Sequence, residues 1–221
     1  MVQLVNLILS SSYTLIQVAS GQTETYKIDL GQIIQVDSEL EIKVGAWANA
    51  QIRLIGFGEI CKNLKLKFNL LGNGANLTLN GALFLIGKSQ VMINIQQNHW
   101  FVNTTSLVKI RTALDDQSQF HYQGLIWVGP SAANTIAHQE NKNLLLSSTA
   151  QASSVPNLEI LNPDVQCGHG SAIGPISPDQ MVYLQSRGLN FLESQNLLVQ
   201  SFLSEALPDK IDLIKLGLEK L

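Results

Sequence analysis

The feature that most constrains this chain is a succession of short segments, from about residue 26 to residue 167, in which apolar and polar side chains alternate. Leu64, Leu66 and Phe68 alternate with two lysines, and the same two-residue period returns repeatedly. Such alternation is typical of a strand that buries one face. We therefore expect a mainly β protein. The other segments with this pattern include Tyr26 to Leu30, Glu39 to Val44, Asn76 to Leu79, Val91 to Ile95 and Leu107 to Ile110.

Many short strands without intervening helices allow a sandwich, a closed barrel or a stacked β-solenoid. Composition helps to choose, because only 14% of the residues are charged and Asn, Gln, Ser and Gly are abundant. Stacked rungs place like residues above like, which favours amide and hydroxyl ladders over charges that would repel one another. The composition therefore favours a solenoid, although no repeat of fixed length is present and a sandwich stays open on the pattern alone.

The pattern changes near residue 177, where a helical tail is expected. Ser177 followed by Pro178 predicts a helix start, with Gln180 completing a capping box. This helix is expected to end at Gly188, since glycine readily takes the left-handed conformation that closes a helix. Residues 1–175 should thus form the β body and residues 176–221 a C-terminal helical segment.

Two further helices are expected in that segment. Asn190 and Glu193 predict the capped start of the second helix, which Pro208 would end. Apolar residues recur at helical spacing between Glu205 and Leu221, which predicts a third, amphipathic helix.

Charge and hydropathy exclude two classes of partner. Lys and Arg number 14 against 17 Asp and Glu, so the net charge of −3 argues against nucleic acid. The apolar stretch from Val2 to Ala19 is interrupted by polar residues and is not preceded by a basic residue, so it predicts neither a signal peptide nor a membrane span.

Two widely separated cysteines, Cys61 and Cys167, indicate free thiols in a reducing compartment, and we expect a cytoplasmic protein. Cys61 is expected to pack in the core.

The densest group of chemically reactive residues lies between Asp164 and Gly170, where Cys167 and His169 stand two positions apart. In an extended segment such residues share a face, so the thiol and the imidazole are placed to hold one metal ion. Two ligands do not complete a tetrahedral site, and the remainder would come from elsewhere in the fold or from another chain. The plainer alternative is a small core cysteine beside a histidine that bonds the backbone.

Four short segments between Gln123 and Leu207 stand out together and in a fixed order: QENKNLLLS at 139–147, PNLEI at 156–160, DVQCGHG at 164–170 and YLQSRGL at 183–189. On these segments the chain resembles the SufB/SufD family of iron–sulfur cluster assembly scaffolds. Ala150 stands where SufB-type members have a cysteine, and His169 is followed by Gly170, so the resemblance is to the SufD-like branch. Members usually have a helical region before the solenoid, whereas this chain begins almost directly in strands.

The resemblance implies a right-handed parallel β-helix that ends in helices. It further implies a non-enzymatic subunit that pairs through its solenoid with a SufB-like scaffold and docks a SufC-like ATPase through its C-terminal helices. An iron–sulfur cluster or iron would be held transiently between the two scaffolds rather than bound stably, with His169 as the metal ligand and Cys167 beside it. The expected ATPase-docking residues are Tyr183, Arg187, Gly188, Phe191 and Phe202, although Arg187 and Gly188 also suit a helix end.

Two other functions remain open on the sequence. A homodimer would bring two copies of His169 together, since symmetric dimers are the commonest oligomers. A β-helical polysaccharide hydrolase or lyase would need paired carboxylates on one face, and Asp115-Asp116 is the only adjacent acidic pair in the body. Because successive strand residues face opposite ways, that pair is poorly suited to the role.

Overall fold

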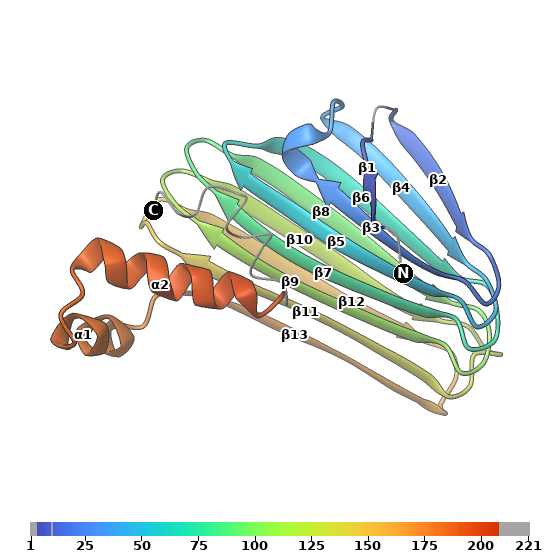
Figure 1. The fold of residues 1–221 in the computed structure, drawn as a ribbon. Coiled ribbons are helices and arrows are strands. Elements are labelled where there is room, and N and C mark those ends of the chain that lie inside the picture. The colour runs from blue at the N-terminus through green and yellow to red at the C-terminus, as the bar shows by residue number, and fades with distance from the viewer. Residues whose placement is uncertain (1–3, 10, 208–221) are drawn as a thin grey trace.

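A computed structural model describes residues 4–9 and 11–207, which form a strand-built body followed by two helices (Figure 1). The strands are β1 Leu4–Leu7, β2 Tyr13–Val18, β3 Thr23–Asp29, β4 Asp37–Val44, β5 Asn49–Gly58, β6 Cys61–Leu70, β7 Asn76–Leu85, β8 Gln90–His99, β9 Thr105–Leu114, β10 Gln119–Val128, β11 Thr135–Leu145, β12 Gln151–Ile160 and β13 Val165–Pro175. A short 3₁₀ turn, Leu30–Gln32, follows β3, and the helices are α1 Pro178–Ser186 and α2 Phe191–Ser204.

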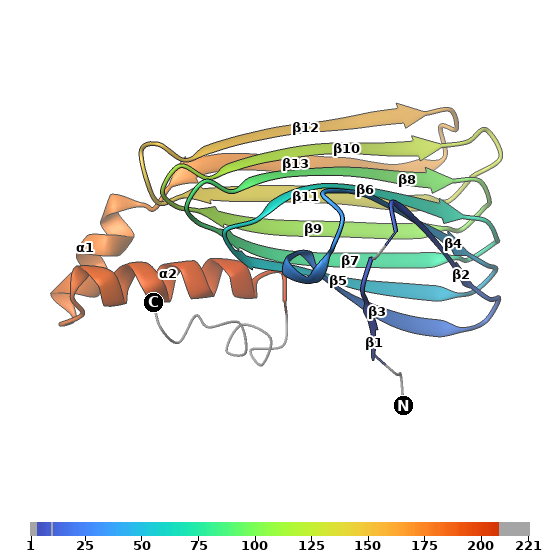
Figure 2. The same ribbon diagram turned by 90° about the horizontal axis from the view of Figure 1, so that it is seen from above.

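Successive strands alternate between two parallel sheets. Odd-numbered strands form one sheet in the order β1-β3-β5-β7-β9-β11-β13, and even-numbered strands form the other, from β2 to β12. Every neighbouring pair is parallel, and each pair lies one full turn of chain apart (Figure 2). The chain therefore winds as a parallel β-solenoid with a helical tail, as predicted, and the sandwich and barrel alternatives are wrong.

The core lies inside the winding and is built from columns of aligned apolar residues. Leu40, Leu66 and Ile95 are in register on three successive strands of the even-numbered sheet, and all three are buried. Apolar and polar residues alternate in the sequence because every second side chain of a strand points into this interior. The predicted strands are all present, but most extend further than the alternation indicated.

Most of the corners that lead from the even-numbered to the odd-numbered sheet share one backbone conformation. In five of these six corners one residue has a positive φ, and its N–H donates to a carbonyl of the following corner; the exception is the last corner, between β12 and β13. Glycine and asparagine suit that conformation, whereas a tryptophan there is unusual. These corner residues are Gly21, Trp47, Gly74, Asn103 and Asn134.

Helix α2 lies along the outer face of the odd-numbered sheet, where Val199 and Leu203 pack on Ala82 and Ala113 of β7 and β9 (Figures 1 and 2). The capping box of Asn190 and Glu193 at its start is confirmed.

Helix α1 begins at the expected place, but the expected cap is wrong. The Ser177 side chain makes no capping hydrogen bond. Pro178, at the first helical position, has no backbone N–H, so one of the groups that a cap would satisfy is absent. Gly188 has the predicted positive φ. The predicted third helix lies outside the described residues, apart from its first three positions, of which Glu205 and Ala206 form a turn after α2. No helix among residues 4–9 and 11–207 is long and apolar enough to cross a bilayer.

Candidate functional site at the last rung

Cys167 and His169 lie on β13, the edge strand of the odd-numbered sheet. Their register partners on β11 are Ala137 and Gln139, both buried in the interior. Because aligned residues of a parallel sheet face the same way, the thiol and the imidazole both point to the inner side of the last rung. The pair thus shares one face, as the two-residue spacing predicted. His169 is nevertheless exposed, since none of the described residues forms a rung above it.

The Cys167 thiol is half-buried against a small apolar cluster that includes Val128, Ala132 and Ala137. Burial raises the pKa of this thiol, and a backbone hydrogen bond from the Ala137 position opposes the shift only in part. Cys167 is therefore a neutral thiol at pH 7 in the isolated chain, and it becomes a good metal ligand only when a cation favours the thiolate.

Gln139 spans the interior directly beneath His169. Its amide oxygen accepts a hydrogen bond from the buried Tyr122 hydroxyl at 2.9 Å, and its amide nitrogen donates to the Asn157 carbonyl oxygen of β12 at 3.1 Å. Gly124 makes room for this brace, since a Cβ there would lie 1.9 Å from the Gln139 oxygen. Burial strongly raises the pKa of Tyr122, which keeps its hydroxyl a donor. Sequence reasoning missed the brace, because no local pattern marks which inward positions meet across the interior.

The rung that carries Cys167 and His169 is uncovered. Strands β12 and β13 are the terminal strands of their sheets, so each has one edge without a strand neighbour among the described residues. Several of their inward apolar side chains are correspondingly exposed; Ile173, for example, is 43% accessible although its partner Asn143 is buried. Leu158 and Ile160 of β12 are exposed in the same way. At this end of the solenoid, apolar side chains that would belong to the core are therefore exposed to solvent.

The described part of the chain brings together no group of three or more His, Cys, Asp or Glu side chains suited to a metal ion. Cys167 and His169 alone would therefore supply at most two of the ligands that a metal ion or cluster needs. Imidazole and thiolate are both suitable ligands for iron. Completion of the coordination sphere would require ligands from outside the described residues.

The carboxylates considered for glycoside cleavage have structural roles at a corner. The Asp115 carboxylate accepts a hydrogen bond from the Asp116 N–H at 2.8 Å, and the Asp116 carboxylate accepts one from the Gly87 N–H at 2.9 Å. Their oxygens therefore stabilise turns instead of facing each other across a cleft, so this pair does not form the paired carboxylates that a hydrolase or lyase would need.

The expectation that Cys61 packs in the core is wrong. Cys61 is exposed at the start of β6, with Sγ 3.9 Å from the Lys88 carbonyl oxygen. The inward positions of β6 are the even-numbered ones, including Leu64 and Leu66, so the odd-numbered Cys61 faces outward.

The residues expected to dock an ATPase lie on the helical pair, and most are exposed. Tyr183 and Phe191 are 58% and 61% accessible, and the Arg187 guanidinium stacks over the Tyr183 ring at 5.3 Å. Gly188 lies in the exposed turn between the helices. Phe202 differs, since it is partly buried and turns toward the solenoid, where it packs against the apolar cluster under α2. Helix α1 contributes no buried residue.

Comparison with known protein families supports this architecture. Residues 17–202 match the family described as SUF system FeS cluster assembly, SufBD core domain. The chain belongs to the SufBD core family. It is similar to the iron–sulfur cluster assembly protein SufD of Escherichia coli K12, with 35% identity over 145 residues, which cover 62% of this chain and 34% of that protein.

Other SufBD relatives give the same result. A SufBD family protein of Synechocystis is 38% identical over 122 residues, which cover 55% of this chain and 26% of the relative. One of Mycobacterium leprae is 33% identical over 142 residues, which cover 61% and 36%, respectively. The aligned region thus spans about a quarter to a third of the length of these curated relatives. The resemblance to SufBD proteins is confirmed.

Proposed function

We propose that this SufBD chain is a non-enzymatic scaffold subunit of a SufBCD-type complex. In this proposal its last rung meets a SufB-like chain, and its helical pair docks a SufC-like ATPase. The observation that carries the proposal is the uncovered last rung, which has Cys167 and His169 on its inner face. An iron–sulfur cluster or iron would be held there transiently, between the two chains.

The chemistry of the open rung suits a partner that is itself built of strands. The outer edges of β12 and β13 leave backbone N–H and C=O groups free to pair with further strands. Leu158, Ile160 and Ile173 offer apolar surface that a second solenoid end would remove from water. Closure of the rung would also exclude water from His169 and bring the missing metal ligands with the partner.

The helical pair suits a separate partner. Val182, Tyr183, Phe191 and Leu192 expose large apolar side chains on α1 and the start of α2, away from the face that packs on the solenoid. Exposed apolar side chains gathered at one end of a molecule are typical of a docking surface. Phe202 would support this surface from beneath, because it fixes α2 on the sheet.

The partner at the open rung is either a SufB-like scaffold or a second copy of this chain. Self-association is geometrically simple, because a two-fold axis would set the same open edge against itself. The chain's two free cysteines suit a reducing compartment such as the cytoplasm.

The deciding experiment is a pull-down of the tagged protein from its own cells, as wild type, as His169→Ala and as His138→Ala. His138 is a matched control, since it is an exposed imidazole on the neighbouring strand that points to the outer face. We expect all three proteins to recover the ATPase and the second scaffold, and only His169→Ala to lower the activity of iron–sulfur enzymes. Undiminished activity with His169→Ala would refute the site, and recovery of neither partner by wild type would refute the complex.

A further inference from the structure

Arg111 is the exceptional charged residue of the solenoid, because it is buried on the outer face of a sheet. It lies on β9 and is only 2% exposed. Helix α2 covers it, and the Phe202 ring lies 5.9 Å from its guanidinium carbon. A buried charge is costly unless it is paired and hydrogen-bonded, so its partners need an explanation.

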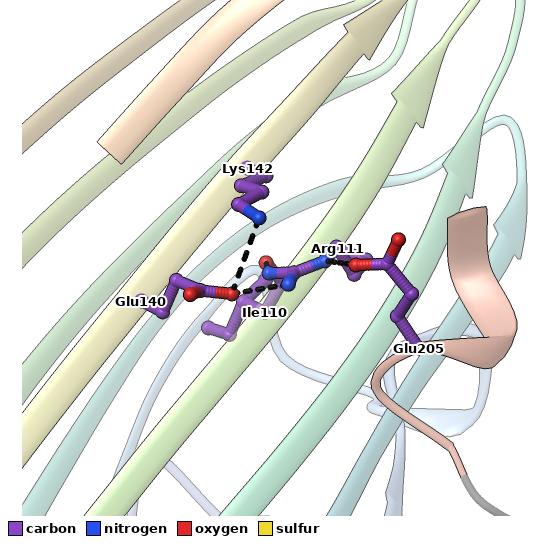
Figure 3. A network of polar contacts seen from close by, with 5 residues as sticks. All are labelled: Ile110, Arg111, Glu140, Lys142 and Glu205. Carbon is purple, nitrogen blue, oxygen red and sulfur yellow. Dashed lines mark hydrogen bonds and ion pairs between the residues drawn. The ribbon is translucent and has the colours of Figure 1, made fainter. Parts of the chain in front are cut away.

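The Arg111 guanidinium bonds three separate parts of the chain (Figure 3). Its Nε donates to a carboxylate oxygen of Glu205, directly after α2, at 2.9 Å. One terminal nitrogen donates to the Glu140 carboxylate on β11, and the other donates to the Ile110 carbonyl oxygen of its own strand at 3.2 Å. Glu140 also pairs with Lys142 at 3.8 Å, and the guanidinium holds the pKa of Glu140 below its usual value despite partial burial.

The Arg111 hydrogen bonds give the contact between α2 and the sheet a fixed orientation, which its apolar part does not provide. Helix α1 buries no residue, and the apolar contact of α2 with the sheet is made by Val199, Leu203 and the partly buried Phe202, with Leu207 just after the helix. Apolar packing has no preferred direction and resists sliding or rotation weakly. A planar guanidinium that bonds two carboxylates fixes the orientation of the elements that carry them, as well as the distance between those elements.

The same bonds reach the strand beneath the candidate site. Glu140 is the register partner of Gly170, one position from His169 on β13. A displacement of α2 that pulls on Glu205 therefore acts through Arg111 on β11, which β13 pairs with along its whole length.

We infer that Arg111 is a positioning residue, which fixes the orientation of the helical pair on the solenoid and links that pair to the strands beside His169. The consequence for cluster assembly rests on the proposed function, since it supposes that an ATPase moves the helices. The structural part of the inference concerns the free chain alone.

The test measures the distance between spin labels on α2 and on the body. Labels at Ser201 and Lys65, both exposed, are introduced with Cys61 and Cys167 replaced by serine. We compare wild type with Arg111→Met, which keeps the apolar stem but removes the fork. Lys142→Met is the matched control, because it removes another cation that pairs with Glu140.

Wild type and Lys142→Met should give one narrow distance distribution, whereas Arg111→Met should give a broadened or displaced one. Amide hydrogens of α2 should exchange about tenfold faster in Arg111→Met, since a buried charged bond between elements is lost. An unchanged, narrow distribution in Arg111→Met would overturn the inference. Should that variant not fold, Glu205→Gln removes one carboxylate at an exposed position, and an unchanged distribution there overturns the inference equally.

A second arm separates this inference from the proposed function. The same labelled proteins are mixed with the ATPase subunit, with and without nucleotide. Failure of wild type to bind the ATPase would refute the docking proposal and leave the orientation result for the free chain standing. Binding accompanied by identical distributions in wild type and Arg111→Met would refute the role of Arg111 alone.

Discussion

His169 on β13 is the register partner of Gln139 on β11, whose side-chain amide braces the interior of the solenoid. The brace joins the two sheets, because Gln139 belongs to one and its partners Tyr122 and Asn157 belong to the other. His169 therefore lies on a strand whose neighbour, β11, is hydrogen-bonded to the opposite sheet through Gln139.

Replacement of Gln139 by leucine should destabilise the protein. The change leaves the buried Tyr122 hydroxyl without its acceptor, which should cost about 2 kcal/mol. Urea unfolding measures the loss. Gln123→Leu is the control, because Gln123 accepts a hydrogen bond from Asn94 on the exposed outer face, and the free energy of unfolding should change by less than about 0.5 kcal/mol. Equal effects of the two substitutions would show that the brace has no special role.

Stability should depend on pH through His99. Its ring nitrogens bond the Thr104 and Ser106 hydroxyls at 2.8 Å, and burial lowers its pKa to about 4. The unfolded chain binds a proton near pH 6.5 and the folded chain does not, so stability falls as the pH drops from about 6.5 to about 4. The total loss should be about 3 kcal/mol. The free energy of unfolding, measured across this pH range, should depend less steeply on pH in His99→Gln than in wild type. His121 is exposed, so His121→Gln should keep the wild-type dependence.

The two helix starts should respond differently to the loss of their capping residues. Asn190→Ala removes a side-chain bond to the Glu193 N–H and should destabilise α2 by about 1 kcal/mol. Ser177→Ala should have little effect, since the Ser177 side chain makes no capping bond. Hydrogen exchange of peptides from α1 and α2 distinguishes the two cases, and a Ser177→Ala effect as large as that of Asn190→Ala would contradict the assignment.

A double-mutant cycle at the corners should separate steric from conformational strain. Gly74 has a φ of +68°, and a Cβ there would lie 2.2 Å from the Trp47 ring. Gly74→Ala should therefore cost more than the roughly 1 kcal/mol expected of a left-handed alanine. In a Trp47→Ala background the ring is gone, and only the conformational cost should remain. Thermal unfolding of all four proteins measures the coupling, which should be absent if the ring moves aside freely.

The extent to which the strands could be predicted is clear at β7. The alternation of Leu77 and Leu79 with polar residues predicts the strand as far as Leu79, whereas the strand continues to Leu85. Its second half is buried on both faces, because Ala82 and Phe84 lie under α2, so the alternation disappears where the helix covers the sheet. Alternation of apolar and polar residues reveals only strands with one exposed face, so it cannot reveal a stretch of strand that is buried on both faces.

The site shows the same division. The sequence by itself determined that Cys167 and His169 share a face, because residues two apart on a strand must do so, and it determined the capped start of α2, because Asn190 and Glu193 are three residues apart. Only the tertiary structure decided that this face is the inner side of an uncovered rung, that Gln139 lies beneath it, and that Arg111 joins Glu140 to Glu205. Arg111 and Glu205 are 94 positions apart, and contacts between distant residues depend on how the chain winds, which no local spacing encodes.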